Sequence, residues 1–63
     1  MSNESEPVYV AEVFYDGKWW IVGAQLDKSH ADEAGEEWFM SRHVNPRTRR
    51  APEVTAYDVM PPF

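Results

Sequence analysis

The sequence predicts a small α+β fold, in which an antiparallel hairpin and a third strand form a sheet with one helix packed on one face. Two runs rich in β-branched and aromatic residues, 8–15 and 18–25, meet at the turn signal Asp16-Gly17. The next segment carries small and apolar residues at helical spacing, and a further β-like run lies near the C-terminus. The expected order is therefore β-β-α-β within a single domain over residues 8–60.

A chain of 63 residues has room for one domain. A domain of that size buries only roughly 60% of the surface of its unfolded chain, so each large side chain matters. The polar stretch 1–7 predicts a disordered N-terminal tail, and Pro-Pro-Phe at 61–63 predicts a short C-terminal tail. The start lacks the pattern of a signal peptide, no apolar run is long enough to span a bilayer, and there is no cysteine. We therefore expect a cytoplasmic protein that does not contact membranes.

The hairpin is unusual because both of its faces are predicted to be apolar. A two-residue turn pairs Tyr15 with Lys18, and counting back from there fixes the remaining register. One face then holds Tyr9, Ala11, Val13, Trp20, Val22 and Ala24. The second face holds Val8, Val10, Glu12, Phe14, Trp19, Ile21, Gly23 and Gln25.

A helix is expected over residues 27–44, with Ser29 as its N-cap and Asn45-Pro46 as its stop signal. Its small residues would let it approach the first hairpin face closely, at Ala11 and Ala24. The stripe predicted to face the sheet is Ala31, Ala34, Gly35, Trp38 and Arg42, flanked by Phe39. The segment 45–52 is expected to be a basic loop, and 53–60 the third strand.

One helix can cover only one sheet face, so the second face is expected to stay largely open, with Val10 and Glu12 in it. Open apolar patches on small proteins are usually interaction sites, and Phe14, Trp19 and Ile21 are the candidate anchors. Two alternatives remain: the segment 61–63 or the basic loop folds back over this face, or the face forms a homodimer with a second copy.

No arrangement of residues in the sequence suggests catalysis. His30 and His43 lie at opposite ends of the predicted helix without a third ligand, and the three glycines are scattered. We therefore expect a protein that is not an enzyme, with no metal and no cofactor.

Charge is distributed unevenly along a chain whose net charge is −5. Glu36 and Glu37 belong to an acidic helix, whereas Arg47, Arg49 and Arg50 lie together in the predicted loop. These five residues are candidate contacts to a partner protein, and direct nucleic-acid binding is not expected. The alternative from another class is an acidic mimic of DNA, which would occupy a DNA-binding protein through its carboxylates.

The segments "LDKSHADEAGEEWF" (26–39) and "EVTAYDVMP" (53–61) resemble small phage-encoded inhibitors of bacterial RNA polymerase. The resemblance covers about a third of the chain. It implies a phage or mobile-element protein that binds and inhibits a host bacterial protein, with RNA polymerase as the target. That family holds the polymerase through arginines of its last strand, where this sequence has Ala56 and Asp58. A second resemblance, carried by "DGKWWIV" and a helix containing "EA", is to HicB-like antitoxin domains.

Overall fold

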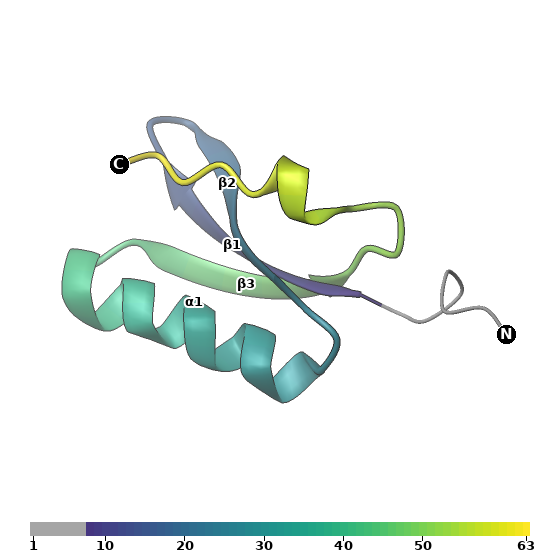
Figure 1. Ribbon diagram of the computed structural model, residues 1–63. Helices are drawn as coiled ribbons and strands as arrows, with labels where there is room; N and C mark the ends of the chain where they lie inside the picture. Colours follow the sequence, from purple (N-terminus) through teal and green to yellow (C-terminus); the bar gives the residue numbers. More distant parts are fainter. Residues whose placement is uncertain (1–7) are drawn as a thin grey trace, which may run out of the picture.

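The computed structural model describes residues 8–63 and confirms the α+β class and the order β-β-α-β. Strands β1 (Tyr9–Tyr15), β2 (Lys18–Gln25) and β3 (Asn45–Arg50) form one antiparallel sheet in the order β2-β1-β3. Helix α1 (Lys28–Arg42) lies on one side of this sheet, and the C-terminal segment with the 3-10 helix η1 (Ala56–Asp58) runs along the other side (Figure 1). The tail predicted at 1–7 lies outside the described residues.

The hairpin turn forms as predicted, but the register shifts once within the strands. Asp16 and Gly17 both have positive φ, 55° and 82°, as a tight turn between right-twisted strands requires. Pairing follows the prediction from Tyr15↔Lys18 to Glu12↔Ile21, and a bulge then places Ala11 opposite Gly23.

Because of this bulge, the predicted face assignment is wrong beyond Ile21. Gly23 lies beside Ala11 and Ala34, on the helix side. Ala24 packs with the cluster around Val10, on the opposite side.

Helix α1 begins one residue before the expected N-cap and ends before Pro46. Its N-cap is Asp27, not Ser29, and no side chain caps the helix there. It ends at Arg42, where His43 adopts a left-handed conformation (φ 60°) and its N–H bonds the Phe39 carbonyl at 2.9 Å.

The small residues of the predicted stripe face the sheet, whereas Arg42 at the end of the stripe is exposed. Ala31 and Gly35 are buried, and a Cβ placed on Gly35 would lie 3.0 Å from the Pro46 Cβ.

The third strand is β3 and not the predicted segment 53–60. The Arg-rich run after Pro46 was expected to be a loop, yet Asn45–Arg50 pairs with β1 from Phe14↔Asn45 to Tyr9↔Arg50. The Ala51 N–H continues this ladder with a 2.7 Å bond to the Val8 carbonyl. Pro46 fits in this strand because it occupies an edge, where a missing N–H need not break a bond to the sheet.

The segment 53–60 instead crosses the second sheet face. Val54 donates its N–H to the Ala51 carbonyl, and η1 follows, with the Asp58 carboxylate accepting from the Thr55 N–H at 2.8 Å. The Asp58 N–H in turn bonds the Thr55 carbonyl at 3.0 Å, and the Thr55 hydroxyl accepts from the Tyr57 N–H at 3.2 Å. These local hydrogen bonds compete with an extended conformation. Further along, the Met60 N–H bonds the Ile21 carbonyl at 2.8 Å.

Part of the second face is therefore covered, and the expectation that it stays open there is wrong. Val10, Ala51 and Val54 form a buried cluster, against which Val8, Ile21 and Ala24 pack. The cover comes from residues 53–60 together with Ala51 of the segment expected to be a basic loop, and not from 61–63. The ring of Phe63 packs instead near Tyr15 and Trp38, with centroids 4.8 and 5.6 Å away, on the helix side.

Candidate functional site

The uncovered end of the second sheet face carries a cluster of aromatic and arginine side chains, one group from each strand. The rings of Phe14 (β1) and Trp19 (β2) meet edge to face, with centroids 5.3 Å apart. The Arg47 guanidinium (β3) lies over the Trp19 ring, 4.0 Å from its centroid. We call the surface formed by Phe14, Trp19, Arg47 and Arg49 around Glu12 the aromatic–arginine face.

Glu12 anchors the two arginines of this face. Its side chain is only 5% exposed, and its Oε1 accepts from Nε of Arg47 at 2.7 Å and from Nε of Arg49 at 3.1 Å. Burial raises the pKa of Glu12, but hydrogen bonds from Arg49 and Arg47 outweigh burial and leave that pKa below its usual value. The same contact with Glu12 raises the pKa of Arg49. Both arginines are thereby held in fixed positions on the sheet.

The aromatic–arginine face keeps positive charge available to a ligand. One carboxylate oxygen serves two guanidinium groups, and each guanidinium engages it through Nε. Glu53 approaches Nη1 of Arg49 at 3.8 Å, but this pair lies at the surface, where ion pairs contribute little to stability. The terminal nitrogens of Arg47 can therefore still donate to an acidic group.

The three candidate apolar anchors differ in their surroundings. Phe14 is 43% exposed, and Trp19 is half-buried beside it. Ile21 packs against the cluster around Val10, and its carbonyl accepts from Met60. Phe14 and Trp19 thus remain accessible, whereas Ile21 mainly supports the fold.

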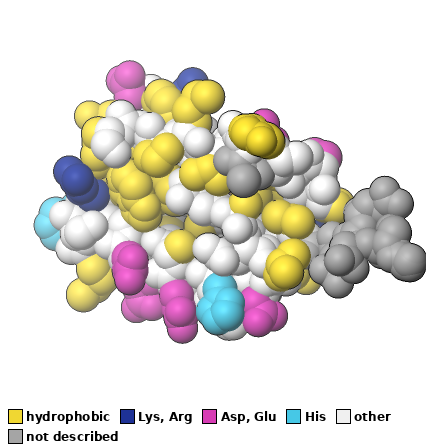
Figure 2. Space-filling view, viewed as in Figure 1, with side chains coloured by type: hydrophobic (Ala, Val, Ile, Leu, Met, Phe, Trp, Pro, Cys, Tyr) yellow, Lys and Arg dark blue, Asp and Glu magenta, His cyan; other side chains and the backbone are white. Residues whose placement is uncertain are grey.

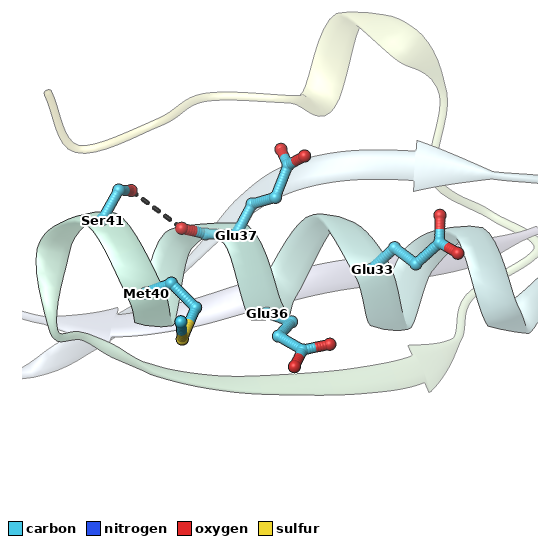
Figure 3. Close-up of a pocket in the computed structure, with 5 residues that line it drawn as sticks. All are labelled: Glu33, Glu36, Glu37, Met40 and Ser41. Carbon is cyan, nitrogen blue, oxygen red and sulfur yellow. Dashed lines mark hydrogen bonds between the residues drawn. The ribbon is translucent and has the colours of Figure 1, made fainter.

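The acidic candidates lie elsewhere. Glu36 and Glu37 are exposed on α1, which covers the opposite side of the sheet from Phe14 and Trp19. Figure 3 shows that Glu36 and Met40 point toward β3, while Glu37 points the other way and Ser41 donates to the Glu37 carbonyl at 2.8 Å. Acidic side chains gather along the α1 side of the molecule (Figure 2).

Glu36 lines a groove beside β3, and Arg47 is among the other residues of that lining. Arg50 lies four residues after Pro46 in β3, so the two side chains point to the same face of the sheet. Because Pro46 lies against Gly35 of α1, Arg50 faces the α1 side.

Sequence reasoning missed the role of Glu12, which it placed in an open face. A glutamate in the middle of an apolar strand is itself a signal, since such a charge needs a partner when buried. Arg47 and Arg49 were not recognised as the partners of Glu12, because residues 45–50 were expected to be part of a loop.

The described part of the chain contains no cluster of three His, Asp or Glu side chains that could hold a metal ion. No helix within residues 8–63 is both long enough and apolar enough to cross a membrane. Comparison with protein family models, with curated proteins and with solved structures gives no match for this chain.

Proposed function

We propose that this protein is a non-enzymatic binding module that holds a partner protein through the aromatic–arginine face. The observation that supports this most directly is that the aromatic and the basic candidate residues, which are distant in the sequence, lie on one surface. Trp19 and Arg47 are in direct contact there. Tryptophan, tyrosine and arginine are the side chains most often found to dominate binding energy at interfaces.

The chemistry of this face suits an acidic partner surface that also carries an apolar side chain. Phe14 and Trp19 offer flat apolar area at a low entropic cost, and Arg47 offers donors at its border. Charge complementarity of this kind mainly sets orientation and association rate.

For the partner we propose a host bacterial protein of the cytoplasm, with RNA polymerase as the first to test. The support for this choice is the sequence resemblance of 26–39 and 53–61 to phage inhibitors of that enzyme. In this proposal the chain acts as a phage or mobile-element factor that inhibits or modulates its target.

The test compares the native protein with Phe14→Ala and Arg47→Gln variants as immobilised baits for purified bacterial RNA polymerase and for host lysate. The matched control is Met40→Ala on the outer surface of α1, where the side chain is 69% exposed. We expect both face variants to lose the partner and the control to retain it, with all four proteins folded by circular dichroism.

Two results would contradict the proposal. In one, a partner is retained by both face variants and lost on charge neutralisation of Glu36 and Glu37, which would make α1 the binding surface. In the other, the native protein is a dimer that dissociates in the Phe14→Ala variant, which would assign the face to a second copy.

A further inference from the structure

Strand β3 forms an open edge of the sheet. It pairs with β1 on one side only, whereas the outer edge of β2 receives a hydrogen bond from Met60. An open edge presents backbone donors and acceptors that can pair with another extended chain.

The register identifies which groups of β3 face outward. In an antiparallel ladder, bonded and non-bonded pairs alternate. The Ala51 N–H bonds Val8, so Arg49 and Arg47 are also bonded to β1, and Pro46, Thr48 and Arg50 point their backbone groups away from it. The outward donors of β3 are therefore the N–H groups of Thr48 and Arg50, since Pro46 has none.

A groove runs beside this edge, between β3 and α1. Its lining includes Phe39 from the helix and Pro46 and Thr48 from the strand, with Asp32 and Glu36 on the helix side and Arg47 across the edge. The Thr48 hydroxyl donates to the Asp32 carboxylate, which ties helix and strand together. A strand added to β3 would place alternate side chains in this groove and on the opposite, arginine-bearing side.

A second copy of the chain is a poor occupant of this edge. Antiparallel pairing about a two-fold axis at Thr48 sets Arg47 opposite Arg49 of the other copy, and like charges directly opposite are destabilising. Pro46 also removes one donor from each copy. The arginines that discourage self-pairing favour an acidic strand instead.

We propose that an extended acidic segment of a partner protein adds to β3 as a fourth strand. Its acidic side chains lie beside Arg47 and Arg49, and the intervening apolar side chains enter the groove against Phe39 and Pro46. This inference goes beyond the proposed function, because it assigns the backbone edge of β3 as a binding site, although Arg47 and Arg49 belong to the aromatic–arginine face as well.

The probe is a capped synthetic peptide of three Val-Glu repeats, titrated into the full chain at low salt. A peptide of three Val-Lys repeats is the control for charge. We expect amide hydrogen exchange of Thr48 and Arg50 to slow on binding, while Arg47 and Arg49, already bonded to β1, change little. The Val-Lys peptide is expected to bind at least about tenfold more weakly.

Two substitutions at one position separate the backbone donor from the side chain. Thr48→Pro removes the outward N–H and is expected to lower the affinity for the Val-Glu peptide about five- to tenfold. Thr48→Val removes the hydroxyl but keeps the N–H, so it is expected to bind like the native protein.

Absence of peptide binding, or equal binding by Thr48→Pro and Thr48→Val, would overturn the edge proposal. Peptide-induced changes confined to Phe14 and Trp19 would also overturn it, while leaving the proposed function standing. Slow exchange of Thr48 and Arg50 in a free protein that sediments as a dimer would assign the edge to a second copy.

Discussion

Glu12 shows how one residue can organise a surface. It lies in the central strand, buried to 4% exposure, and holds two arginines of the neighbouring strand by charge-assisted hydrogen bonds. The position of Arg47 over Trp19 depends on that carboxylate. Removing one partner from such a network lowers the free energy of unfolding by more than the whole network adds to it, because the remaining buried charge is left without a partner.

We predict that Glu12→Gln destabilises the protein by about 1–3 kcal/mol at pH 7. The folded-state pKa of Glu12 is lowered, so its contribution is present above the unfolded value of about 4.3 and is lost as pH falls through the folded value. The difference between native protein and variant should therefore shrink below about pH 4. Urea unfolding of both proteins at pH 7 and pH 3 measures this difference in the free energy of unfolding. A larger difference at pH 3 than at pH 7 would contradict the prediction.

The two glycines at the helix–sheet contact should respond differently to a methyl group. We predict that Gly35→Ala is destabilising by about 1–3 kcal/mol, because its Cβ would lie 3.0 Å from the Cβ of Pro46. The added helix propensity of about 1 kcal/mol only partly offsets this clash. At Gly23 the atom nearest to a new Cβ is the Cβ of Ala34 at 3.6 Å, which is an ordinary van der Waals contact. Gly23→Ala should be neutral or slightly stabilising, and thermal unfolding of both variants tests the contrast.

Among the elements, β3 departs most from sequence expectation. Proline and three arginines in six residues are atypical of a strand, yet the strand pairs along its full length with β1. Edge position explains both features: charged side chains reach solvent, and the missing N–H of Pro46 points outward.

A proline substitution in β3 should therefore depend on strand parity. Thr48→Pro leaves the bonds to β1 intact and is expected to cost little stability, apart from the lost hydroxyl contact with Asp32. Arg49→Pro removes a bond to β1 in the ladder and a contact with Glu12, and it is expected to unfold the protein or cost about 3 kcal/mol or more. Equal stability of the two variants in urea would show that the inferred alternation is wrong.

At the scale of the whole molecule, the sheet lies between α1 and the C-terminal segment. The cluster of Val10, Ala51 and Val54 closes one end of the second face, and the aromatic–arginine face lies toward the hairpin turn. Because a small domain has little apolar area to bury, the C-terminal segment is a substantial part of the core.

Truncation separates the two parts of the C-terminal segment. Ending the chain at Arg50 removes Ala51 and Val54 from the cluster and exposes Val10, so we predict loss of cooperative folding. Ending it at Met60 removes only the two prolines and Phe63. The aromatic contacts of Phe63 with Tyr15 and Trp38 lie at the surface. That shorter deletion should leave a folded protein with a lower melting temperature. Circular dichroism melts of both truncated chains test this, and a folded chain ending at Arg50 would contradict it.

Sequence reasoning recovered the α+β class, the hairpin turn and the small-residue stripe of α1. Each depends on neighbours close in the chain: Asp16 and Gly17 tolerate positive φ, and Ala31 and Gly35 recur at helical spacing. It named Phe14, Trp19 and Arg47 as candidates without placing them on one surface. The single bulge at Ala11/Glu12 placed Gly23 and Ala24 each on the face opposite to the predicted one, which no local pattern indicated.

What the sequence determined by itself is therefore the set of local conformations and the class of fold. Tertiary structure decided which segment became the third strand and which one covered the second face. The physical reason is that Asn45–Arg50 has poor strand propensity but gains a full ladder with β1, whereas 53–60 forms its own Thr55–Asp58 hydrogen bonds and buries Val54 against Val10. That choice brought Arg47 and Arg49 to Glu12 and Arg47 to Trp19, and with them the surface on which the proposed function depends.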